Sequence, residues 1–164
     1  MPNVLADCAE AVKAALNDAD PWPFSQEFEC EWSYADWELP LEENRRKGLL
    51  VEAVPVSQLS TDPETQGSLK YGPSIDVVVR VYLGPERRAP DGRYNVEEIN
   101  QYTQLVQDIN SFFSFDRFGD NEVFAWDSET GTKIFAAYKP SHLREHHQFT
   151  GIVRVPFRCS VIMG

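Results

Sequence analysis

The sequence is poor in the features on which redox, metal and nucleotide chemistry depend. Its three cysteines, Cys8, Cys30 and Cys159, are widely spaced and form no C-x-x-C pair. All three occupy positions on the apolar faces of their elements, so we expect reduced core residues. The nine glycines never form the G-x-G-x-x-G or G-x-x-x-x-G-K-S/T patterns that bind phosphates, and a G-x-S-x-G elbow is missing too. We therefore predict no catalytic residue and no cofactor-binding residue.

Positive charge is also scarce. Fifteen Lys and Arg residues face 26 Asp and Glu residues, which gives a formal net charge of -11 at pH 7. A protein that holds DNA tightly replaces counterions on the phosphates with Lys and Arg, and this composition opposes such binding. Solubility is the simplest explanation of the charge, and DNA is expected to be at most a neighbour.

Long uncharged apolar segments are absent. The N-terminal region is amphipathic and contains Asp7, Glu10 and Lys13, so we expect neither a membrane partner nor an export signal. What the chain does have is 164 residues of which 42% are hydrophobic, enough for one sizeable core and too few for two. We predict a single domain over residues 1–164.

Two amphipathic helices are predicted from spacing and capping signals. Apolar residues recur at helical spacing from Val4 to Leu16, behind a candidate N-cap at Asn3. The second helix begins at Asn95, where Glu98 three residues later resembles a capping box and an apolar stripe follows.

Strands are predicted where apolar residues alternate with polar ones or form short buried runs. The last of them, which contains Arg154 and Arg158, is expected to have one wet face. The predicted strands cover residues 24–34, 49–56, 75–83 and 149–161, and a hairpin joins 122–126 to 132–138.

Helices and strands do not alternate strictly, which excludes a doubly wound parallel sheet. We predict an α+β fold: a mainly antiparallel sheet with two helices packed on one face, plus a C-terminal hairpin and strand. Two long loops are expected at about residues 57–74 and 84–94, both mobile until a partner orders them. The second has a basic tip formed by Arg87, Arg88 and Arg93.

The histidines give the only signal of a metal site. His142 and His146 have the i, i+4 spacing of helical zinc ligands, but no H-E-x-x-H order is present and Pro140 and Ser141 precede them. A solvated polar turn is the preferred interpretation, and we predict no metal ligands. A small metal-dependent enzyme using His142 and His146 remains the alternative from a different functional class.

Two further features concern surfaces. Glu27, Glu29 and Glu31 fall on one face of the first predicted strand, opposite apolar residues, so the pleat should expose their carboxylates. In an oligomer the same row could face a lumen. Trp37 lies beyond that strand, where core packing and a protein interface explain it equally well.

The order and spacing of these elements resemble tail terminator and tail completion proteins of tailed bacteriophages, over nearly the whole chain. The resemblance rests on a short N-terminal helix, a strand ending near Tyr34, an acidic stretch at Glu38 to Glu43, a strand closing on Val54-Pro55-Val56, a long loop, a strand from Ile75 to Leu83, a helix from Asn95 and a final strand opening at Phe149.

The resemblance implies a non-enzymatic subunit of a ring, typically hexameric, that caps the tail tube and joins the tail to the neck of the filled head. The implied partners are further copies of the chain, the tail tube protein and a neck or connector protein, with DNA only in passage. The implied location is the virion, after assembly in the host cytoplasm. Another head-tail connector or stopper ring is the alternative. Trp37, Arg87, Arg88 and Arg93 become candidate contacts, and Glu27, Glu29 and Glu31 a candidate channel surface.

Overall fold

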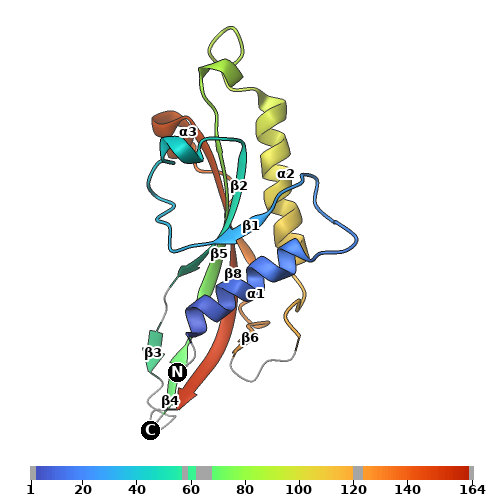
Figure 1. Ribbon diagram of the computed structural model, residues 1–164, viewed down its shortest axis with the longest axis vertical. Coiled ribbons are helices and arrows are strands. Elements are labelled where there is room, and N and C mark those ends of the chain that lie inside the picture. Colours follow the sequence, from blue (N-terminus) through green and yellow to red (C-terminus); the bar gives the residue numbers. More distant parts are fainter. Residues whose placement is uncertain (1–2, 57–58, 62–67, 120–123, 163–164) are drawn as a thin grey trace.

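Three α-helices and eight strands form an α+β architecture in the computed structural model, which describes residues 3–56, 59–61, 68–119 and 124–162 (Figure 1). The helices are α1 (Val4–Asn17), α2 (Val96–Phe112) and α3 (Pro140–His146), with 3-10 turns η1 (Glu43–Arg45) and η2 (Pro85–Arg87). The strands are β1 (Cys30–Trp32), β2 (Leu49–Val56), β3 (Leu59–Thr61), β4 (Ser68–Tyr71), β5 (Ser74–Tyr82), β6 (Phe124–Trp126), β7 (Lys133–Ala136) and β8 (Gln148–Ile162).

Local capping signals position the first two helices. The Asn3 side chain accepts a hydrogen bond from the Ala6 amide at 3.1 Å. The Asn95 side chain accepts from Glu97 and Glu98 at 3.0 and 3.4 Å. Caps of this kind contribute about 1 kcal/mol each, and both predicted helix starts are confirmed. None of the described helices is long and apolar enough to cross a membrane.

The sheet is built around β8. Its strand order is β1-β2-β5-β8-β4-β3, with β6 and β7 paired to β8 outside that path. The β1–β2 pair is parallel, and every other pairing among the described residues is antiparallel. The predicted α+β class with a mainly antiparallel sheet is confirmed at this level.

The sheet continues into a long arm. Val56 lies opposite Ser74 and Leu59 lies opposite Tyr71, so β2–β5 and β3–β4 share one register and form a single extended hairpin. The end of β8 pairs with β4, and the arm extends beyond α1 and α2 (Figure 1). The prediction of a structureless loop at 57–74 is therefore wrong for β3 and β4, because the distant strand β8 pairs with β4 and β4 pairs with β3. Residues 57–58 and 62–67 lie outside the described part.

The predicted C-terminal hairpin is wrong. β6 and β7 pair one after the other along the same edge of β8, opposite Cys159 and Arg154, and no pairing joins them to each other. The residues between β6 and β7 do form a turn, in which the amide of Gly131 donates to the carbonyl of Asp127 at 2.8 Å. That turn separates two strands that both pair with β8 and run in the same direction, so it does not reverse the chain. Residues 122–123 lie outside the described part.

The first predicted strand is much shorter than expected. Only β1 forms, and the alternation over residues 24–29 reflects aromatic packing. Phe24 lies 5.2 Å from both Phe28 and Phe112, measured between ring centroids. The Ser25 amide donates to Asp108 of α2 at 2.9 Å. This hydrogen bond holds the segment against the helix instead of in a β-strand pairing.

The main core lies between one face of the sheet and the two long helices. It includes buried side chains of α1, α2 and the central strands, among them Cys8 and Cys30, so the prediction that these two cysteines are core residues is confirmed. The Cys159 side chain is outside the described part. Helix α2 packs tightly against β8 at Gly151. A Cβ at this position would lie 2.5 Å from Val106 Cγ2 and 3.0 Å from the Ala137 carbonyl oxygen.

Candidate functional site

The face of the sheet opposite α1 and α2 carries a buried layer of charged side chains. Glu52 and Asp76 are fully buried, and Arg80 is only 4% exposed. The segment between β1 and β2, with α3, lies over this face, as their hydrogen bonds to Glu52, Gln148 and Thr150 show. The wet face predicted for the last strand, β8, is therefore wrong at Thr150 and Ile152, which are buried, and is confirmed at Arg158, which is exposed.

Glu52 fastens the overlying segment to β2. Its carboxylate accepts from Arg80, from the Ser33 hydroxyl at 2.8 Å and from Arg45 at 3.0 Å. Burial acts to raise the pKa of Glu52, but the hydrogen bonds and the charges of the two arginines outweigh it and lower the pKa below its ordinary value. An ionised, fully bonded carboxylate suits a structural clamp better than a proton donor.

Trp37 is fixed by a second ion pair in the same layer. Arg154 donates to Asp76 at 2.8 and 3.0 Å, and the Trp37 indole donates to Asp76 at 3.3 Å. Trp37 is half-buried and packs against a small cluster formed by Val54, Val78 and Ile152. Packing and hydrogen bonding within the domain thus explain much of the position of Trp37, the aromatic residue predicted as a candidate interface contact.

The exposed aromatic at this location is Phe135 on β7. Phe135 is 47% exposed, and its ring lies 6.1 Å from Trp37 and 4.1 Å from the Arg154 guanidinium carbon. Lys133 is exposed two residues earlier on the same strand. Sequence analysis missed this pair, although the alternation in Lys133-Ile134-Phe135-Ala136 is the signal that places Lys133 and Phe135 on one face.

Two of the three arginines at the predicted basic tip are engaged within the domain. Arg87 forms an ion pair with Glu98 and donates to Tyr102 at 3.0 Å. Arg88 contacts His147 and lies over the ring of Tyr94 at 4.9 Å. Arg93 is different: its side chain is 87% exposed and its ion pair with Asp91 is 3.5 Å long.

The loop that carries this tip is more structured than the prediction of an irregular loop at 84–94. It contains η2 and a bridge between Arg88 and Tyr94. Of the three arginines predicted as contacts, only Arg93 has a largely exposed side chain.

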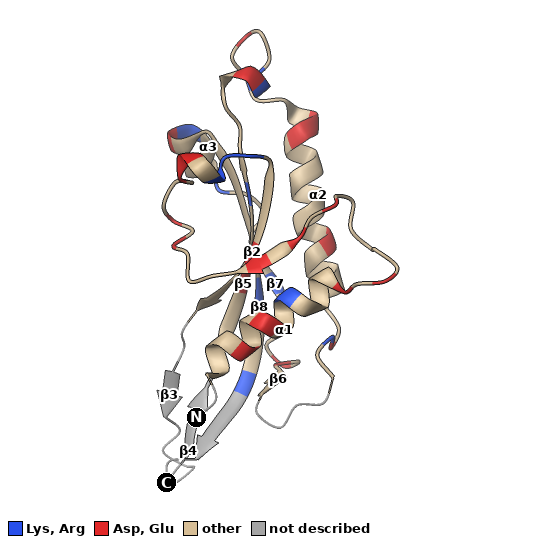
Figure 2. Ribbon diagram, in the orientation of Figure 1, with Lys and Arg blue, Asp and Glu red and all other residues tan. Residues whose placement is uncertain are grey.

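The three predicted channel carboxylates are all exposed. Glu27 and Glu29 precede β1, and Glu31 lies within it, with a side chain that is 68% exposed and 3.9 Å from Arg45. Their exposure is as predicted, whereas a continuous strand face is not, because the ladder begins only at Cys30. Figure 2 shows acidic positions spread along α1, α2 and the adjoining loops.

The histidines do not form a solvated turn. His142 lies on α3, is 3% exposed, and has Nδ1 at 2.8 Å from the Thr150 hydroxyl. Its ring lies 5.3 Å from that of His146, so the predicted shared face exists. Among the described residues no three His, Cys, Asp or Glu side chains are grouped as they would be to hold a metal ion.

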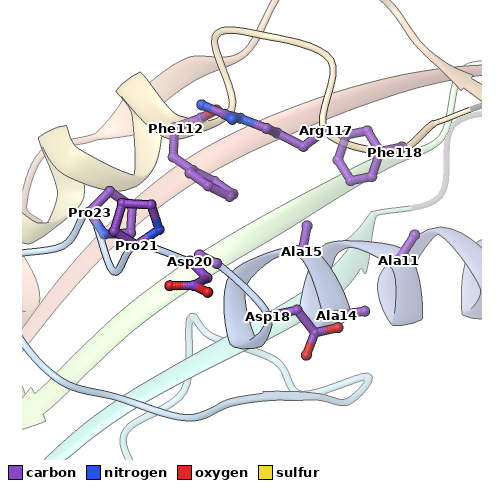
Figure 3. A pocket seen from close by; sticks show the side chains of 11 residues that line it. Ala11, Ala14, Ala15, Asp18, Asp20, Pro21, Pro23, Phe112, Arg117 and Phe118 are labelled. Atoms are coloured by element: carbon purple, nitrogen blue, oxygen red, sulfur yellow. The ribbon is translucent and has the colours of Figure 1, made fainter.

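An open groove of about 640 Å³ lies between the end of α1 and the segment that follows α2 (Figure 3). Small apolar side chains of α1 line one side, and two phenylalanines, two prolines and the cationic side chain of Arg117 line the others. Two exposed carboxylates stand at its margin. These residues include Ala11, Ala15, Pro21, Pro23, Phe112, Phe118, Asp18 and Asp20.

No protein-family model matches the chain, and a search among curated proteins finds no relative. The site is therefore interpreted from its own geometry. That geometry is a rigid sheet with a polar clamp on one face, and on the surface it leaves an aromatic and cationic patch on β7, an open apolar groove and an acidic segment before β1.

Proposed function

We propose that this chain is a structural subunit of a ring, typically hexameric, that caps the tail tube of a bacteriophage and joins the tail to the neck. The arm formed by β2–β3, β4–β5 and the end of β8 carries this proposal. Strands that run on past the helices covering their own sheet offer backbone edges to neighbours, and edge pairing is a common basis of assembly.

The finer architecture supports the same proposal. Two long helices pack against one face of a mainly antiparallel sheet, as in the family that the sequence resembles. The other face is closed by the Glu52 and Asp76 ion pairs, which hold the segment before β2 in a fixed position. A rigid body of this kind suits a subunit that must present constant surfaces to a tube below and a neck above.

Charge supports a ring that lets DNA pass. A net charge of -11 on each subunit, repeated around a channel, repels phosphates and keeps the passage free of tight contacts. In this proposal Glu27, Glu29 and Glu31 face the channel. The tail tube protein and a neck or connector protein are the partners, and the virion is the location. A stopper ring at the same neck would use the same features.

Tail tube growth tests the function. The purified chain is added to polymerising tail tube protein from the same phage, and tube lengths are measured by electron microscopy. The proposal predicts that tubes stop growing and carry a ring at one end. Tubes that grow unchanged, with no ring bound at their ends, would reject the proposed function.

A further inference from the structure

Two exposed surfaces of the domain have complementary chemistry. The first consists of Lys133 and Phe135 on β7. The second is the groove beside α1, with Asp18 and Asp20 at its margin. Among the described residues, neither Lys133 nor these two aspartates forms an ion pair, although most of the arginines do.

The two surfaces lie on opposite sides of the sheet. Ile134 packs into the main core beneath the helices. Phe135 lies against Trp37 and Arg154 on the other face, and Lys133 shares that face because it lies opposite Arg154 in the ladder. The groove is formed by α1 and the segment after α2, which lie on the helical side. One molecule therefore cannot bring its own Phe135 to its own groove.

We propose that Phe135 of one copy inserts into the groove of a second copy, with Lys133 paired to Asp18 or Asp20 of that copy. The groove has room for an aromatic ring. Phe118 in its wall offers an edge-to-face contact, and Arg117, whose guanidinium carbon lies 4.4 Å from the Phe112 ring centroid, offers a cation–π contact. Lys133 and Phe135 are about 7 Å apart along the strand, which places a cation near the acidic margin when the ring is inside.

This contact is heterologous, because two different surfaces meet. Repetition of such a contact generates a closed ring when the rotation between copies closes, and a filament when it does not. The inference rests on the proposed ring and names its subunit contact. It also explains why a chain with a net charge of -11 leaves an exposed Lys133 unpaired beside an exposed aromatic.

A mixing experiment tests the contact. Phe135→Glu removes the inserted ring and leaves the groove intact, whereas Ala15→Trp fills the groove and leaves Phe135 intact. Each variant alone is expected to lose oligomers in light scattering, and an equal mixture is expected to form dimers, since one intact surface remains on each. Val96→Glu, a change at a 69% exposed residue on α2, is the matched control and should assemble normally.

Asp20→Lys is a second groove variant in case Ala15→Trp does not fold, and combining it with Lys133→Glu should restore assembly. Oligomers that persist in Phe135→Glu and in a folded groove variant overturn the contact, as does a mixture that stays monomeric. A wild-type chain that is monomeric in solution also overturns it, whereas the proposed function is judged separately by tube growth.

Discussion

The guanidinium of Arg154 on β8 donates two hydrogen bonds to the carboxylate of Asp76 on β5, at 2.8 and 3.0 Å, from the position directly opposite in the ladder. Asp76 is fully buried and also accepts from Trp37. This pair links two central strands to the segment that covers them. Its hydrogen bonds raise the pKa of Arg154 above its ordinary value, so the guanidinium stays charged.

Removing one partner of this pair should be costly. Asp76→Ala leaves Arg154 without its counterion beneath Trp37, and the free energy of unfolding should fall by about 3–5 kcal/mol. The double variant Asp76→Leu, Arg154→Leu, which removes both charges, should lose much less. Urea unfolding followed by tryptophan fluorescence measures both. Equal losses in the single and double variants would show that the pair does not act as a unit.

Gly151 should not tolerate a side chain. The Cβ of Gly151→Ala would meet Val106 and the Ala137 carbonyl, and the overpacking should cost about 1–3 kcal/mol of stability. Adding Val106→Ala relieves the closer contact, so the double variant should lose less than the sum of the two single losses. Additive losses would mean that α2 does not press on β8 at this point.

The starts of α1 and α2 could be predicted from the sequence because helix capping depends on neighbouring residues. Asn3 and Asn95 satisfy amides two or three residues away, and both helix starts follow from a few letters of sequence. β3 and β4 could not be predicted in this way, because β3 pairs with β4, and β4 pairs with β8, which lies about ninety residues further along the chain. Sheet pairing over such distances is not encoded in the segment itself.

The buried charged residues show a second limit of prediction from sequence. Alternation along β5 places Asp76 and Arg80 on the face opposite the helices, but periodicity does not say what covers a face. The covering segment carries Trp37 and Arg45, whose positions depend on tertiary contacts. A single acid such as Glu52 within an otherwise apolar strand is the signal that points to a buried ion pair.

Acid should weaken the fold through His142 before it affects Glu52. Burial, with the charges of Lys139 and His146, lowers the pKa of His142 below its ordinary 6.5. The unfolded chain then binds the proton first, so stability is full above about pH 6.5 and falls as the pH drops toward the lowered value. His142→Gln should remove this loss, whereas His146→Gln should keep it.

Unfolding measured at a series of pH values checks this prediction. The loss due to Glu52, whose pKa is also lowered, begins only below its ordinary value of 4.5, so any loss between pH 6.5 and pH 4.5 is not due to Glu52. A His142→Gln variant that loses stability as steeply as the parent between pH 6.5 and pH 4.5 contradicts the assignment to His142.

The acidic segment before β1 should control contact with DNA. Replacing Glu27, Glu29 and Glu31 with Gln should leave the free energy of unfolding almost unchanged, because the carboxylates are exposed. Replacing them with Lys should create salt-sensitive DNA binding that the parent lacks.

The matched control for the Lys variant places three lysines at other exposed acids: Glu10, Glu97 and Glu145. Fluorescence anisotropy at two salt concentrations compares the variants in the assembled state. If the channel assignment is right, the Glu27, Glu29 and Glu31 variant binds DNA more tightly than the control. Equal binding by the two would place these carboxylates outside the channel.

Ring formation by the purified chain tests the central claim most directly. Light scattering after size-exclusion chromatography gives the mass, and negative-stain electron microscopy shows whether the particle is closed. The account predicts a fixed multiple of the 18.7 kDa chain, with a hexamer as the expected form, and a ring with a central opening. A chain that remains monomeric at every concentration, both alone and with tail tubes, would contradict it.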